Sequence, residues 1–419
     1  MVKAIVQVPL LMGLVCSAGV YSAELDEVQR ELEQTRAQLD ALQARVTAGE
    51  QNTAARAKSF VVYGFAQLDM IQDFERVNPN WEATLRPSRT PTQDGQYGSD
   101  GQTIASVRQS RLGVEATLPL GDDSIHTVFE FDLYGVGSDE GQTTMRVRHA
   151  YGEWQSVLAG QTNSLFMDGN VFPNVIDYWG PAGMVFLRNP QIRWTPVRGT
   201  NTLAVAIEKP GNDVDDGILG AAGYDITGDQ PLPDLTAHFR READWGHFQV
   251  AGILRDVAYE SVQSTDNEPS GGDLGWGVNL TGTLKVGRDT VRLGTVYGEG
   301  IASYMNDGGM DMAPQGLSAD SLSSVPLLGV IAYYDHQWSD RYSSSMGYSF
   351  TEVDNQAFQL GTAFKKGEYL SANVLFAPRK NLLLGVEYLW GQRTDFNGAA
   401  GTDNRVQVSF KYSFSSQDF

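Results

Sequence analysis

The chain has 419 residues, including 45 Gly, 17 Tyr, 8 Trp and one Cys, and a formal net charge of −20 at pH 7. This acidic balance argues against nucleic acid as a partner of the whole molecule. After the N-terminus there is no apolar run long enough for a transmembrane helix. Nor is there the alternation of strands and helices that an α/β fold would require.

The first 23 residues have the features of a secretory signal peptide. Lys3 supplies the positive charge, residues 10–15 form the apolar centre, and cleavage is expected after Ser22 or after Ala23. Cys16 would leave with this segment, so the mature protein would contain no cysteine. That pattern fits an exported protein that needs no disulfide.

Residues 24–49 follow a heptad pattern, which predicts an α-helical coiled coil that holds several subunits together. The alternative is an amphipathic helix that packs on its own domain. Residues 50–58 form a polar linker. The apolar heptad positions are Leu25, Leu32, Leu39 and Val46 at a, with Val28, Thr35 and Leu42 at d.

From residue 59 to 419 the chain is predicted to form one antiparallel β-barrel of about 16 strands. Tight turns alternate with long connections such as 209–233, 261–272 and 300–324, an asymmetry typical of transmembrane barrels. The predicted strands are 60–73, 103–118, 124–135, 143–154, 157–166, 189–196, 201–209, 234–242, 246–257, 274–285, 290–298, 326–338, 342–353, 368–377, 381–393 and 405–414.

Side-chain alternation supports membrane-spanning strands. Leu112, Val114 and Ala116 share one face, opposite polar and small residues. Tryptophans stand near strand ends, as interfacial girdles do. A barrel of about 16 strands is wide enough for an aqueous channel. The last strand ends in an aromatic residue, and either Phe414 or Phe419 would serve as the terminal aromatic of an outer-membrane barrel.

A stretch from 145 to 194 holds the features most informative about function. Alternation places Arg146 and Arg148 on one face with Ala150 and Gly152, and Val147, His149 and Tyr151 on the other. Two arginines among small residues suit a wet interior. The long irregular segment 166–181 contains Asp168 and Asp177 among aromatic residues. Connections of this length usually have a function or are disordered, and we predict a constriction loop folded into the lumen.

The same alternation places seven arginines on the lumen face. Guanidinium groups stay charged and offer planar donors to carboxylates, so a ring of them favours anions. The alternative is a structural network in which Glu115, Glu130 and Asp132 neutralise the arginines. Both interpretations hold if the arginines line one wall of the lumen and the acids of the loop line the other wall. Such an arrangement would produce an electric field across the lumen. The predicted pore-lining residues are Arg111, Arg146, Arg148, Arg193, Arg240, Arg255 and Arg292.

Much of the negative charge falls in predicted loops, where solvated carboxylates are expected. These residues are Asp213, Asp215, Asp216, Asp266, Glu268, Asp307 and Asp311. The five histidines lack metal-ligand spacing, and the sequence contains no cofactor fingerprint. We therefore predict neither a metal, nor a cofactor, nor an enzyme. An ester or lipid hydrolase using Asp335 and His336 is the least favoured alternative.

Several short motifs resemble the DcaP-type porins of Gram-negative outer membranes. They are the heptads, residues 62–69, 109–113, 129–132, 146–153, 159–162 and 386–388. The resemblance implies a trimer of 16-stranded barrels surrounded by outer-membrane lipid and lipopolysaccharide, with a periplasmic coiled coil. It also implies passive uptake of small anions, dicarboxylates among them. A structural tether between membrane and cell wall, and a general non-selective porin, are the alternative functions.

Overall fold

The computed structural model describes residues 36, 38–40, 58–262, 266–318 and 321–418. Arg36 and Gln38–Asp40 are helical. The predicted signal peptide and almost all of the predicted coiled coil and linker lie outside the described residues, and so does Phe419.

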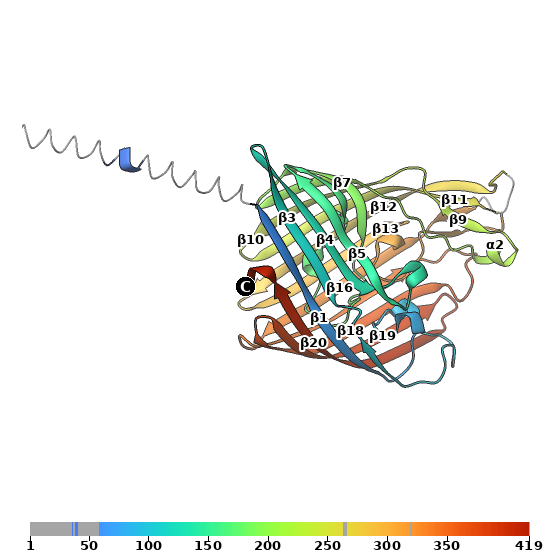
Figure 1. Ribbon diagram of the computed structural model, residues 1–419. Helices are drawn as coiled ribbons and strands as arrows, with labels where there is room; N and C mark the ends of the chain where they lie inside the picture. The colour runs from blue at the N-terminus through green and yellow to red at the C-terminus, as the bar shows by residue number, and fades with distance from the viewer. Residues whose placement is uncertain (1–35, 37, 41–57, 263–265, 319–320, 419) are drawn as a thin grey trace, which may run out of the picture. The chain divides into compact units, whose positions relative to one another are not determined.

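One antiparallel sheet of 18 strands forms the barrel wall. β2 and β3 both pair with β1, and β9 and β10 both pair with β11. Each pair occupies one position in the wall, so the barrel has the 16 positions that the sequence predicts. β20 pairs with β1 and closes it, as the red and blue strands of Figure 1 show.

The strands of the wall are β1 (Ser59–Asp73), β2 (Gln102–Ser106), β3 (Arg111–Leu120), β4 (Asp123–Tyr134), β5 (Thr143–Trp154), β6 (Val157–Asn163), β7 (Arg188–Val197), β8 (Asn201–Glu208), β9 (Ile226–Asp229), β10 (Asp234–Ala243), β11 (Gly246–Ser261), β12 (Ser270–Val286), β13 (Asp289–Glu299), β16 (Pro326–Gln337), β17 (Tyr342–Val353), β18 (Phe364–Arg379), β19 (Leu382–Asp395) and β20 (Ala400–Ser415). Each of the 16 predicted strands overlaps one of these positions.

The burial of alternate residues shows which face of each strand meets the lumen. On β1, Gln67, Asp69 and Asp73 are buried, whereas Leu68 and Met70 are exposed. Exposed apolar side chains on the outer face are what a lipid-facing wall requires. No helix among the described residues is long and apolar enough to cross a membrane.

Connections at one end of the barrel are short, for example 155–156, 244–245 and 287–288. Those at the other end are long and carry the remaining elements. These are η1 (Pro79–Trp81), η2 (Pro87–Arg89), η3 (Gly137–Asp139), η4 (Gly169–Val171), α2 (Gly217–Ala221), η5 (Ala302–Tyr304) and the hairpin β14 (Met312–Pro314) with β15 (Leu322–Ser324). η6 (Ser416–Asp418) follows the last strand.

A β-bulge between β4 and β5 changes which side chains face the lumen. Glu130 pairs with His149 and Phe131 with Val147, so Arg148 is the extra residue. Because a bulge resets the alternation, His149 lies inside the barrel, with its Nδ1 3.0 Å from Thr162 Oγ1. The prediction that His149 shares a face with Val147 is therefore wrong, since Val147 remains exposed on the outside.

Candidate functional site: the lumen cavity

The connection between β6 and β7, residues 164–187, makes contacts with opposite sides of the barrel, and we call it the crossing segment. Its first part is held by β8 and β10–β12. Glu208 accepts hydrogen bonds from Ser164 Oγ and Leu165 N, both at 3.0 Å. Asp168 accepts from Arg240 Nη1 at 2.9 Å and Thr281 Oγ1 at 2.8 Å.

The second part of the crossing segment is held by β18, β19 and β20. Glu387 accepts hydrogen bonds from Ile176 N at 3.1 Å and Asp177 N at 2.9 Å. Gln407 donates to the Ile176 carbonyl at 3.2 Å, and Tyr369 OH donates to Asp177 at 3.1 Å. The segment thus runs from one wall to the other, because its polar groups find partners on both.

The two carboxylates of this segment are anchors, since Asp168 is 3% exposed and Asp177 is 2% exposed. Burial alone would raise the pKa of Asp168, but the hydrogen bond and charge of His247, the charge of Arg240 and the Thr281 hydroxyl lower it to about 2. Burial raises the pKa of Asp177 above its usual value. Asp177, unlike Asp168, also borders the lumen cavity, and an electric field across the lumen with this pair as its acidic wall stays a prediction.

Beside the crossing segment lies a cavity of about 1380 Å³. Of the seven predicted arginines, Arg111, Arg146 and Arg148 border it. Five further cations border it that are not among the predicted pore-lining residues: Arg86, Arg89, Arg188, Arg393 and Lys411. Strand alternation would have found Arg393 and Lys411. It would not have found Arg188, which begins β7 out of phase with Arg193, and nothing in the sequence shows that the loop holding Arg86 and Arg89 folds back over the lumen.

Three of these cations share two carboxylates. Arg146 Nη2 lies 2.7 Å from Asp132, and Arg148 lies 2.7 Å from Glu130 and 3.1 Å from Asp132. Arg111 Nε is 3.5 Å from Glu130. The predicted neutralising network therefore exists around Glu130 and Asp132, while Glu115 has no ion pair with these arginines among the described residues.

Two more cations have no carboxylate partner in the part of the chain that the structure describes. The Arg188 guanidinium carbon lies 5.0 Å from the Phe186 ring centroid, and Lys411 Nζ lies 4.0 Å from that of Phe65. We define the inner cation cluster as Arg111, Arg146, Arg148, Arg188 and Lys411. Five positive charges minus the two negative charges of Glu130 and Asp132 leave a surplus of three.

The other four predicted arginines face inward but do not border this cavity. Arg240 binds Asp168 and Arg292 binds Asp335 at 2.6 Å, where Arg292 borders a second cavity of about 310 Å³. Arg193 donates to Gln191 at 3.0 Å. Alternation gives the face of a residue but not its partners, so a pore-lining role for Arg193, Arg240 and Arg255 stays a prediction.

Arg255 holds the loops instead. It is 3% exposed, and its guanidinium lies 3.2 Å from Asp234 and 3.0 Å from Asp311. It also donates to the carbonyls of Gly300 and Gly211. Asp311 is thus buried, and the expectation that it is a solvated loop charge is wrong.

Asp307 departs from the same expectation, since it accepts a hydrogen bond from Arg86 Nε at 2.8 Å and is 2% exposed. Asp307 nevertheless borders the cavity, as do Asp213 and Asp215 on its loop side. The acidic loops therefore comprise buried anchors and cavity-facing groups, which their sequence positions alone do not distinguish.

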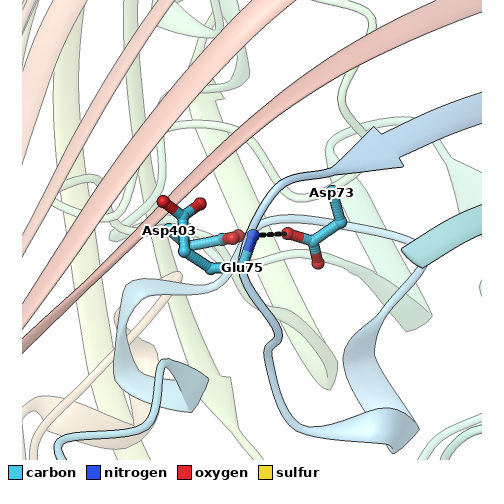
Figure 2. Close-up of side chains that lie close together, drawn as sticks. All are labelled: Asp73, Glu75 and Asp403. Atoms are coloured by element: carbon cyan, nitrogen blue, oxygen red, sulfur yellow. Dashed lines mark hydrogen bonds between the residues drawn. The ribbon is translucent and has the colours of Figure 1, made fainter. Parts of the chain in front are cut away.

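Three carboxylates, those of Asp73, Glu75 and Asp403, lie together near the loop end of β1 and β20 (Figure 2). Arg405 Nη2 lies 3.0 Å from Asp73 and 2.6 Å from Asp403. Both oxygens of Glu75 accept hydrogen bonds from Asn404. Because a buried guanidinium already occupies the position between two of the acids, the arrangement is an internal ion-pair network.

A family model for the DcaP outer membrane protein matches residues 24–414. No curated protein sequence matches the chain. Among solved structures, the outer membrane channel DcaP of Acinetobacter baumannii is similar, with a TM-score of 0.73 and 25% identity over 85% of this chain and 98% of that one.

Vibrio cholerae OmpT is similar in fold alone. Its variant lacking loop L8 has a TM-score of 0.54 and 11% identity, over 85% of this chain and 100% of that one. The in-vitro folded protein in its trimer form has a TM-score of 0.50 at the same identity and coverage.

Proposed function

We propose that this chain, which belongs to the DcaP outer membrane protein family and is an outer-membrane channel, passes small organic anions by passive diffusion. Dicarboxylates are the solutes that we expect it to favour. The inner cation cluster carries this proposal, because its surplus of three positive charges borders the cavity. A surplus greater than one matches a solute with two carboxylates.

Arg188 and Lys411 are the groups best placed to meet such a solute. Neither forms an ion pair with a carboxylate within the described residues, whereas Arg146 and Arg148 do. A guanidinium binds a carboxylate through two parallel hydrogen bonds. Contacts at a wet cavity wall remain weak enough for release, which conduction requires.

The test is the reversal potential of single channels in a KCl gradient, with succinate added to measure block. The wild type should prefer anions, and Arg188→Gln should lower the anion-to-cation permeability ratio about threefold, since it removes one of three surplus charges. Arg198→Gln is the matched control, because Arg198 lies in the short connection between β7 and β8, pairs with Glu153 and borders neither cavity. A wild type without preference would identify a general porin and overturn the proposal.

We extend the proposal to a homotrimer with a periplasmic coiled coil at residues 24–49. The heptads support it, as does Leu39, a predicted core position that is 58% exposed in the single chain. The trimer form of OmpT, a protein similar in fold, is consistent with such an assembly. Deleting residues 24–48 should leave folded barrels, measured by heat-modifiable migration. Loss of barrel formation would show that the two regions are not separate.

The alternatives are less well supported. A structural tether needs no open lumen, whereas this barrel contains a cavity of about 1380 Å³. The protein is a channel and not an enzyme. Asp335 is held by Arg292 at 2.6 Å, and His336 lies 3.0 Å from Asp289, so Asp335 and His336 do not form a catalytic pair.

A further inference from the structure

The short helix η2 and the end of β19 place a second group of cations on the loop side of the cavity. We define the outer arginine site as Arg86, Ser88, Arg89 and Arg393, all of which border the cavity. Ser88 N and Oγ donate to Asp307 at 2.8 and 2.6 Å. Arg86 Nε binds the same carboxylate at 2.8 Å. One end of η2 is therefore fixed to the connection between β13 and β16.

Arg393 fixes the other side of η2. Its Nη1 donates to the Ser88 carbonyl at 2.8 Å, and its Nε binds Asp395 at 2.7 Å. The Arg86 guanidinium lies over the rings of Trp81 at 4.2 Å and Trp179 at 4.5 Å. The backbone that carries Arg89 is thus held by groups from three separate parts of the chain, which limits the reorganisation needed to bind a solute.

Arg89 is the arginine of this site whose side chain has no partner within the described residues. Its guanidinium has no hydrogen bond or ion pair with any residue that the structure describes, and its Nε is buried without a partner. Three guanidinium groups in this site face two carboxylates, Asp307 and Asp395, which leaves a surplus of one. A buried donor without a partner is costly, so a ligand that accepts its hydrogen is favoured.

The outer arginine site is separate from the deepest part of the inner cation cluster. Along β19 and β20, Arg393 pairs with Gly401 and Leu383 pairs with Lys411. Ten residues of strand separate these two levels, or about 33 Å along the chain. Between them stand Tyr178 and Trp179 of the crossing segment. Trp179 contacts Arg86, and Tyr178 OH accepts a hydrogen bond from Arg148 at 3.2 Å.

We propose that the outer arginine site is a distinct capture site for small carboxylate anions, with Arg89 as the group that binds them. An anion entering from the loop side meets Arg89 first and then passes Tyr178 and Trp179 to the inner cation cluster. Two weak sites in series allow entry and release to proceed without one tight complex. This inference rests on the proposed function, since it assumes that anions use the cavity.

The test compares Arg89→Gln with Arg89→Lys and with Arg76→Gln. Arg76 belongs to the same loop, but its Nε donates to the Ser99 carbonyl. Single-channel block is recorded with succinate in one chamber at a time. The orientation of each channel is read from a bulky thiol label on Leu317→Cys, at a position that is 76% exposed.

Arg89→Gln should lower the association rate of succinate about threefold from the loop side and leave the rate from the other side unchanged. Arg89→Lys should restore most of the rate, because it keeps the charge, and Arg76→Gln should behave as the wild type. An equal loss from both sides, or no loss, overturns the capture site. Failure of the proposed function shows separately, as a wild-type reversal potential without anion preference.

Discussion

Arg188 and Arg255 are both arginines on the lumen side of the barrel, yet their surroundings differ completely. Arg255 lies between Asp234 and Asp311 and also donates to two loop carbonyls. Arg188 borders the cavity and contacts the Phe186 ring, with no carboxylate partner among the described residues. The first guanidinium holds the loops together, whereas the second remains available to a solute.

This difference shows that the function of a lumen arginine depends on the carboxylates within its reach. Asp234 belongs to β10, and Asp311 belongs to the connection between β13 and β16. These two parts of the chain are distant in sequence. Around Arg188, the nearby acid Asp132 is already bound by Arg146 and Arg148. Substitutions that change the pairing should therefore separate stability from selectivity.

The largest effect is expected for Arg255→Met, which leaves two buried carboxylates without their cation. Removing one partner of a buried ion pair costs about 3–5 kcal/mol. We expect that loss in urea unfolding of the folded barrel, together with faster proteolysis of residues 209–225 and 300–325. Arg288→Gln, which breaks an exposed pair, should cost less than about 1 kcal/mol. Equal stability of the two variants would show that Arg255 is not an anchor.

The next effect concerns selectivity. Replacing Arg146 and Arg148 together with Ala removes two cations, leaves Glu130 paired with Arg111 and leaves Asp132 without an ion-pair partner among the described residues. The reversal potential should therefore change from anion preference toward cation preference, a larger shift than Arg188→Gln produces. Block by succinate should weaken in parallel.

The control for that variant is Asp216→Asn, because Asp216 does not border the cavity. Its reversal potential should equal that of the wild type, since exposed charge is screened within about 8 Å at physiological salt. Asp213→Asn should raise anion preference slightly, because Asp213 does border the cavity. Equal effects of the loop and strand substitutions would refute the assignment of selectivity to the inner cation cluster.

The smallest effect is a pH dependence at the Asp168 anchor. Its pKa in the folded protein is about 2, below the ordinary value of 3.8, so folding favours the ionised form. The corresponding stability, about 2 kcal/mol, is present above pH 4 and lost as the pH falls to 2. The difference in unfolding free energy between wild type and Asp168→Asn should shrink over that window. A constant difference would show that the carboxylate does not act through its charge.

Most of the wall was predictable from sequence because strand alternation is local. The 16 strand positions and the inward direction of all seven arginines follow from it. The bulge at Arg148 was not predictable, because one unpaired residue changes the face of His149 without any signal in composition. The ion pairs that anchor Asp307 and Asp311 were also not predictable, because their partners Arg86 and Arg255 are distant in sequence.

The site was harder to predict than the wall for the same physical reason. A free guanidinium is defined by the absence of neighbouring acids, and neighbours in a barrel come from adjacent strands and from loops that fold inward. Arg89 illustrates this, because its position depends on contacts that η2 makes with Asp307 and Arg393. The spacing of residues in the sequence does not indicate that η2 makes those contacts.

The pairing of β1 with β20 has a consequence for how the chain folds. Residues 63–73 pair with residues 405–415, the first and last strands of the wall. Until the final strand is synthesised and exported, β1 has an unpaired edge, which is prone to aggregate. Contacts this distant in sequence also form slowly. A chain truncated before residue 400 would lack β20 and would keep two open strand edges, one on β1 and one on β19.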